Sequence, residues 1–103
     1  MDASVALPAN PPTPLRVLVV EDSEFDARIL VTQLRTGGWQ VTFKRVASAE
    51  ALLALLRAEP WDLVLCDHTM PGFSAPEALR LLQATGLDLP FIIISGGIEE
   101  GVA

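Results

Sequence analysis

Acidic and hydroxyl side chains follow three separate apolar runs of the sequence. Glu21 and Asp22 come directly after RVLVV, while Asp67 ends LVLCD and Ser95 ends PFIIIS. Short apolar runs rich in β-branched residues are typical of strands buried on both faces. Because the carboxyl ends of parallel strands meet at one edge of a sheet, we expect three carboxylates and a hydroxyl to converge in one crevice.

Carboxylates held this close together favour a bound cation. Like charges raise one another's pKa, so the carboxylates stay ionised only if a positive charge shares the site. The sequence holds one histidine and one cysteine, and therefore no cluster of softer ligands. Oxygen ligands favour a hard ion, and Mg²⁺ suits a small carboxylate set better than zinc. The pattern predicts a magnesium site.

Predicted strands and helices alternate along the chain. Strands are expected from about residue 16 to 20, at 41–46, at 63–67 and at 90–95, and helices at 23–36, 48–58 and 74–85. Helices of this length between apolar strands imply right-handed βαβ units around a parallel sheet. The fold class is therefore α/β.

The first predicted helix has a clear start. Ser23 is a plausible N-cap, and Asp26 stands three residues later in a capping-box relation. Phe25, Ile29 and Leu34 are expected near one helical face.

Composition limits the kind of protein and its surroundings. Half of the 103 residues are hydrophobic and the net charge is −6, which argues against binding to a nucleic-acid backbone. No run approaches the roughly 20 apolar residues that span a bilayer. Residues 1–14 hold four of the eight prolines and read as a flexible leader before a domain at 15–103. A single cysteine and the lack of a signal-peptide pattern favour a cytoplasmic location.

The segment from about Leu15 to the end resembles a response-regulator receiver domain of two-component signalling. The resemblance rests on the acidic pair 21–22, on Asp67, on the Met-Pro-Gly turn at 70–72 and on Ser95. Four separate elements match in the same order, so the combination is specific. It implies a doubly wound sheet in the flavodoxin-like order 2-1-3-4-5, with strand 5 and helix 5 missing from this chain.

The resemblance also implies a function. Asp67 would accept a phosphoryl group from a phosphohistidine on a sensor histidine kinase or a phosphotransfer protein. Mg²⁺ would be held by Asp22, by Asp67, by the main-chain carbonyl of Thr69 and, through water, by Glu21. The chain would then be a signalling phosphoprotein and response regulator in a phosphorelay, and no enzyme beyond weak autophosphatase activity.

Two further residues receive roles from the same resemblance, and a third is a candidate because of its position. Ser95 would turn toward the aspartyl phosphate as the switch hydroxyl, and the N–H of Gly96 would add a donor. His68 is a candidate phosphate contact because it follows the acceptor, although a lone histidine in a loop is usually just exposed.

The sequence departs from the family at one important position. A receiver places a lysine at the end of its fifth strand, whereas the only lysine here is Lys44, in the second predicted strand. We expect phosphoryl transfer by the 103 residues to be slowed or uncoupled from the switch. We also expect the strand at 90–95 to be an exposed edge, so that the chain forms a homodimer or a strand-swapped oligomer unless it is part of something longer.

Competing functions make different demands on the same residues. A haloacid-dehalogenase-like phosphatase requires a second acid two positions after its nucleophile, where this chain has Thr69. In a nucleotide- or flavin-binding domain, Glu21 and Asp22 would repel the phosphate at the first loop. A non-phosphorylated pseudo-receiver that acts through surface contacts stays open as the alternative.

Overall fold

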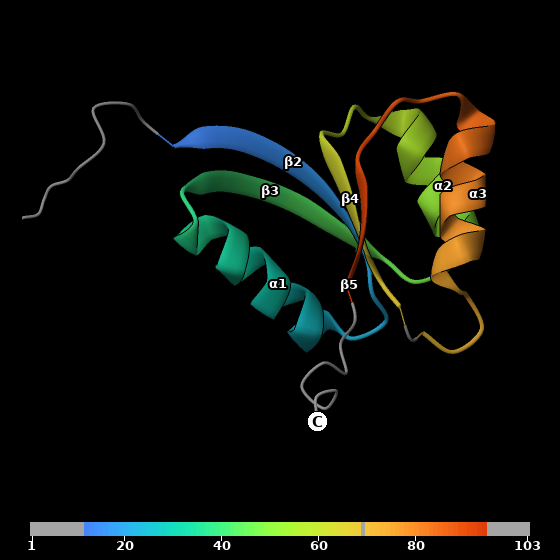
Figure 1. The fold of residues 1–103 in the computed structure, drawn as a ribbon, viewed down its shortest axis with the longest axis horizontal. Helices are drawn as coiled ribbons and strands as arrows, with labels where there is room; N and C mark the ends of the chain where they lie inside the picture. Colours follow the sequence, from blue (N-terminus) through green and yellow to red (C-terminus); the bar gives the residue numbers. More distant parts are fainter. Residues whose placement is uncertain (1–11, 69, 95–103) are drawn as a thin grey trace, which may run out of the picture.

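The structure is a computed structural model that describes residues 12–68 and 70–94. Its elements, labelled as in Figure 1, are β2 (Thr13–Val20), α1 (Glu24–Thr36), β3 (Trp39–Val46), α2 (Ala49–Ala58), β4 (Leu63–Asp67), α3 (Ala75–Thr85) and β5 (Phe91–Ile94). The first two strands begin two to three residues earlier than the sequence predicts, because they pair along their whole length, from Thr13 beside Trp39 to Val20 beside Val46.

The four described strands form one parallel sheet. Their order is β3-β2-β4-β5, which is second, first, third and fourth along the described chain. The predicted flavodoxin-like order is therefore confirmed. In the register of the sheet, Val20 lies beside Cys66, and Asp67 lies beside Ile94. The strands consequently end close to one another at the same edge.

Helices cover both faces of the sheet. Figure 1 shows α1 on one side and the pair α2 and α3 on the other. The central strand β2 serves both layers, because Leu18 and Val20 pack with α2 and α3 whereas Val17 and Val19 pack with α1. The doubly wound arrangement is confirmed. None of the three described helices is long and apolar enough to cross a membrane.

Helix α1 begins as predicted but packs through a different face. The hydroxyl of Ser23 accepts a hydrogen bond from the N–H of Asp26 at 3.1 Å, as an N-cap does. Phe25 and Ile29, however, are 71% and 42% exposed. The expectation that they share the packing face of Leu34 is wrong, because the residues in contact with the sheet are spaced i, i+3, i+4 and i+7: Ala27, Leu30, Val31 and Leu34.

The loop after β4 is anchored on both sides of a sharp turn. Met70 and Phe73 are buried in the core shared with α2 and α3. Between them Gly72 has φ +78°, in the left-handed region that favours glycine. Helix α3 then starts with a capping box, in which Ser74 and Glu77 bond each other's backbone N–H. The chain is thus anchored between Met70 and Glu77.

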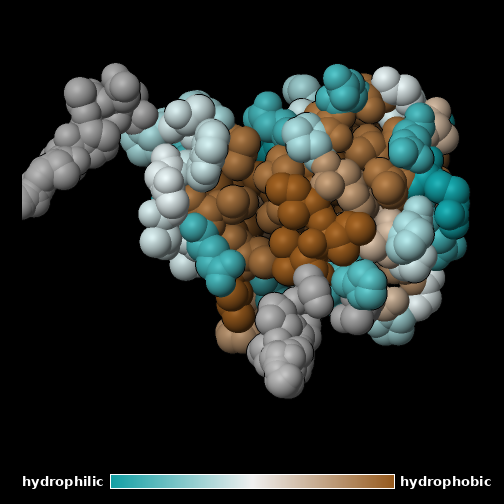
Figure 2. Space-filling view, in the orientation of Figure 1, coloured by the Kyte–Doolittle hydropathy of each residue, from teal (hydrophilic) through white to brown (hydrophobic). Residues whose placement is uncertain are grey.

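Within the described chain, β5 is an edge of the sheet. It pairs with β4 on one side, and its Ile92 and Ile93 are 47% and 45% exposed. Figure 2 shows hydrophobic side chains gathered where β5 crosses the front of the molecule. The expected exposed, uncharged edge is present among the described residues.

Candidate functional site

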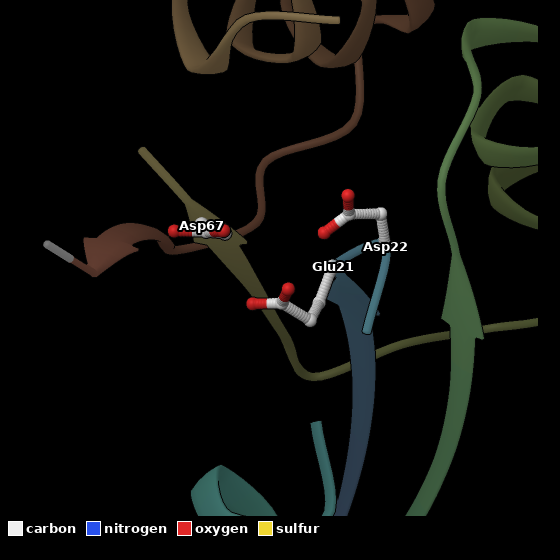
Figure 3. Close-up of side chains that lie close together, drawn as sticks. All are labelled: Glu21, Asp22 and Asp67. Carbon is white, nitrogen blue, oxygen red and sulfur yellow. The ribbon is translucent and has the colours of Figure 1, made fainter. Parts of the chain in front are cut away.

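Three carboxyl groups meet at the carboxyl ends of β2 and β4. Glu21 and Asp22 directly follow β2, and Asp67 ends β4, the neighbouring strand. One oxygen from each of the three residues lies within 4.8 Å of the others. Figure 3 shows the carboxyl groups of Glu21 and Asp22 turned toward that of Asp67. The predicted convergence is therefore found for these three acids.

The turn formed by Glu21 and Asp22, called the acidic turn below, is hydrogen-bonded to the neighbouring chain. The backbone N–H of Glu21 donates to the carbonyl of Val46 on β3 at 2.9 Å. The N–H of Ser23 donates to a carboxyl oxygen of Glu21 at 3.1 Å. Because Ser23 also caps α1, the turn between β2 and α1 is fixed at both ends.

Glu21 is the most buried of the three acids, with 4% of its surface exposed. Burial raises the pKa of Glu21 from 4.5 to about 7, against the opposing hydrogen bond from Ser23. A hydrogen bond with the side chain of Asp22 and the negative charge of Asp67 raise that pKa further. Below a pH of about 7 the raised pKa favours a proton on Glu21, and a divalent cation bound at the site would compete with that proton.

The donor set fits a small hard cation. Carboxylate oxygens are the ligands that Mg²⁺ prefers. An octahedral Mg²⁺ ion with ligands at about 2.1 Å keeps them no more than about 4.2 Å apart. Since the three oxygens lie within 4.8 Å of one another, small side-chain movements suffice to gather the three carboxyl groups around one ion, directly or through water. Asp22 is exposed and Asp67 half-buried, which leaves an approach from solvent.

The cysteine next to the site is chemically quiet. Cys66 is fully buried, and burial, followed by the charges of Asp67 and Glu21, raises the pKa of its thiol to about 11. The neutral thiol is no nucleophile near pH 7. The interpretation of Cys66 as a small core residue is confirmed.

Residues 17–103 match the family described as response regulator receiver domain. The chain belongs to this family. Receiver domains are signalling phosphoacceptors of two-component systems and bind Mg²⁺ in their active site.

Curated relatives of this receiver domain occur in bacteria and plants. The virulence sensor protein BvgS of Bordetella pertussis is 40% identical over 82 residues, which are 80% of this chain and 6% of BvgS. The two-component response regulator ORR41 of Oryza sativa subsp. japonica is 31% identical over 83 residues, 79% of this chain and 65% of that protein. The receiver domain thus spans only part of these relatives.

Solved structures share the fold. The crystal structure of FixJ-N matches with a TM-score of 0.65 and 32% identity, over 79% of this chain and 63% of that one. The receiver domain of the sensor histidine kinase PA1611 from Pseudomonas aeruginosa PAO1 matches with a TM-score of 0.65 and 24% identity, over 86% of this chain and 73% of that one. That structure has a magnesium ion coordinated in its active site cleft.

The remaining residues predicted for the receiver site are placed in part. His68 is exposed, and its backbone N–H donates to the carbonyl of Ile94 at 2.9 Å, so this N–H already has a partner in the sheet. Thr69, Ser95 and Gly96 lie outside the described residues. Their roles stay predictions.

Two basic residues near the end of β3 have different partners. Lys44 pairs with Glu59, the residue that follows α2, and so takes no part in the acidic site. Arg45 donates from Nη1 to the backbone carbonyls of Glu21 at 3.1 Å and Asp22 at 3.4 Å. Sequence reasoning missed this contact, because a cation near a strand end becomes informative only when the neighbouring strand is known.

Proposed function

We propose that this chain is the phosphoacceptor receiver of a two-component phosphorelay. Asp67 takes the phosphoryl group from a phosphohistidine of a sensor histidine kinase or a phosphotransfer protein, and Mg²⁺ is the cofactor. The observation that carries the proposal is the convergence of Glu21, Asp22 and Asp67 within 4.8 Å in a chain of the receiver family. A cytoplasmic location belongs to the proposal and fits the single, buried cysteine.

The reaction requires little from the protein beyond a nucleophile held in place. A carboxylate oxygen of Asp67 attacks the phosphorus, an O–P bond forms, and the N–P bond to the donor imidazole breaks with the electron pair leaving on nitrogen. Bound Mg²⁺ neutralises the charge between the carboxylate and the phosphoryl oxygens. Asp22 and Asp67, with the carbonyl of Thr69, would hold the ion directly. Glu21 would act through water.

Three residues complete the proposed site. The hydroxyl of Ser95 would bond an oxygen of the aspartyl phosphate and so report its presence, and the N–H of Gly96 would donate to the same group. The imidazole of His68, exposed directly after Asp67, would contact the phosphoryl group from the solvent side.

Uptake of phosphate from a small phosphodonor tests the proposal. The chain is incubated with acetyl phosphate, with and without Mg²⁺, and its intact mass is measured. Calorimetry with the wild type and Asp22→Ala measures Mg²⁺ binding in parallel. Uptake that requires Mg²⁺ supports the proposal. Absent uptake, whether or not Mg²⁺ binds, would favour the alternative of a non-phosphorylated pseudo-receiver that acts through surface contacts.

Exposed apolar side chains next to the acids offer a contact surface for a protein donor. Phe25 and Ile29 lie on the outward face of α1, which starts two residues after Asp22. We predict that Phe25→Ala slows phosphoryl transfer from a phosphohistidine protein by about tenfold, as loss of one aromatic contact does. Uptake from acetyl phosphate is expected to be unchanged, because Phe25 is 71% exposed and is not one of the three clustered acids.

Rates of transfer from both donors, measured on the same preparation, check this prediction. Leu87→Ala is the matched control, since Leu87 is 44% exposed and follows α3. An equal loss with both donors would place the effect of Phe25 in the site itself and contradict a docking role.

The edge strand predicts self-association of the chain. Ile92 and Ile93 expose apolar surface on β5. Among the described strands β5 pairs only with β4, so its other edge can pair with a second copy of the chain. Light scattering is expected to give a mass that rises with concentration. Ile93→Lys is expected to reduce the measured mass at high concentration, because a charge on an edge strand opposes pairing with a second copy. A monomer at all concentrations would refute the homodimer or strand-swapped oligomer.

A further inference from the structure

Arg45 joins β3 to the turn that carries two of the three acids. Its guanidinium Nη1 donates to the carbonyl oxygens of Glu21 and Asp22, at 3.1 and 3.4 Å. The register explains the reach, because Arg45 lies beside Val19, two residues before Glu21. The side chain of Arg45 therefore extends along β2 toward the acidic turn.

A second contact from β3 reinforces the first. The carbonyl of Val46 accepts from the N–H of Glu21 at 2.9 Å. Glu21 is thus held through its N–H by the backbone of β3 and through its carbonyl by Arg45. Asp22 follows directly, and its peptide carbonyl is the other acceptor of Arg45. Both peptide groups that flank the side chain of Asp22 are consequently restrained.

Arg45 has two effects on the affinity for a metal ion, and they are opposite in sign. A guanidinium close to the site repels a divalent cation and weakens binding. A guanidinium that fixes the turn keeps the carboxyl group of Asp22 beside those of Glu21 and Asp67, and so strengthens binding. Measurement of the metal affinity therefore separates the two roles.

We infer that Arg45 is a positioning residue, which holds the Glu21–Asp22 turn so that the carboxyl group of Asp22 is preorganised for the metal. This inference rests on the proposed function for the identity of the ligand. Arg45 touches neither the metal nor the phosphoryl group, and acts on them through two backbone carbonyls. Lys cannot replace it fully, since an ammonium lacks the planar fork of donors.

Lys44 provides a matched control one residue away. Lys44 lies beside Leu18, whose side chain packs on the α2 and α3 side, and its ammonium pairs with Glu59. Arg45 lies beside Val19, whose side chain packs on the α1 side. Lys44→Ala and Arg45→Ala therefore remove the same charge from the same strand, and only the second removes the contact with the acidic turn.

Calorimetric Mg²⁺ titration of the wild type, Arg45→Ala, Arg45→Lys, Lys44→Ala and Asp22→Ala tests the inference. Arg45→Ala is expected to weaken Mg²⁺ binding by about fivefold to tenfold, Arg45→Lys by less, and Lys44→Ala by less than about twofold. Without metal, the amide hydrogen of Ser23 is expected to exchange faster in Arg45→Ala than in Lys44→Ala, because the turn opens more often. The exchange measurement needs no metal.

The outcomes distinguish this inference from the function on which it rests. If the wild type binds Mg²⁺ and Asp22→Ala does not, unchanged or tighter binding in Arg45→Ala overturns the positioning role alone. If the wild type does not bind Mg²⁺, the metal role fails for both proposals. Exchange at Ser23 that is no faster in Arg45→Ala than in Lys44→Ala would then also contradict the proposed restraint of the turn by Arg45. Equal losses in Arg45→Ala and Lys44→Ala would assign the effect to charge or to general stability.

Discussion

Asp67→Asn is expected to abolish phosphoryl uptake, with a loss of at least about 100-fold in rate against the wild type. In the proposed reaction the side chain of Asp67 would supply the attacking oxygen, and an amide oxygen carries no charge to attack an anionic phosphoryl group. The fold is expected to survive, because Asp67 ends β4 and is half-buried. Intact mass after incubation with acetyl phosphate and Mg²⁺ is the measurement.

Asp62→Asn is the matched control for this experiment. Asp62 lies just before the other end of β4, where its carboxyl group accepts from the backbone N–H of Arg16 at 2.8 Å. An amide oxygen can accept the same bond, so uptake in Asp62→Asn is expected to equal that of the wild type. The phosphate on the wild type is expected to be released by hydroxylamine, as an acyl phosphate is. Uptake that persists in Asp67→Asn would place the acceptor elsewhere, for instance on His68.

The acidic site was predictable because it depends on a rule about strand ends. Apolar runs that end in Asp67 and in the pair Glu21 and Asp22 indicate parallel strands, and such strands bring their carboxyl ends together. Neither step requires knowledge of side-chain packing. The family resemblance then assigned roles to acids that physical reasoning had already grouped.

The contacts that the sequence did not reveal depend on register and on helix rotation. Arg45 reaches the acidic turn because the register of β2 and β3, which starts with Thr13 beside Trp39, places Arg45 beside Val19. The sequence of either strand alone does not determine this register. Phe25 and Ile29 look like core residues by type, yet Ala27 and Val31 take the buried face of α1. Small residues pack closest to the sheet, and a pattern based on large apolar residues misses them.

Glu21 is expected to make the stability of the metal-free chain fall as the pH rises from about 4.5 to about 7. The folded chain keeps a proton on Glu21 up to a pKa of about 7, whereas the unfolded chain releases it near 4.5. Between these values the folded state binds more protons, so a higher pH favours unfolding. The carboxyl group changes the free energy of unfolding by at most about 3 kcal/mol across this window.

Glu21→Gln isolates this effect, because an amide of the same shape does not titrate. The melting temperature of the variant is expected to vary less between pH 4.5 and 7.5 than that of the wild type, and to exceed it at the upper end. Metal binding has the opposite dependence on pH. Mg²⁺ must displace the proton of Glu21, so its stabilising effect on the wild type is expected to grow as the pH rises through 7.

The difference in melting temperature between the wild type and Glu21→Gln, followed across the pH range, tests the prediction. Three other acids have pKa values lowered by their hydrogen bonds and charged partners: Glu24, Glu59 and Glu77. Their effects on the pH dependence of stability therefore lie at pH values below 4.5, and they are the same in the wild type and the variant. Parallel melting curves for the wild type and Glu21→Gln across the window would mean that Glu21 is already ionised. Glu21 would then hold no proton in the metal-free chain, and Mg²⁺ binding would not depend on the titration of Glu21 near pH 7.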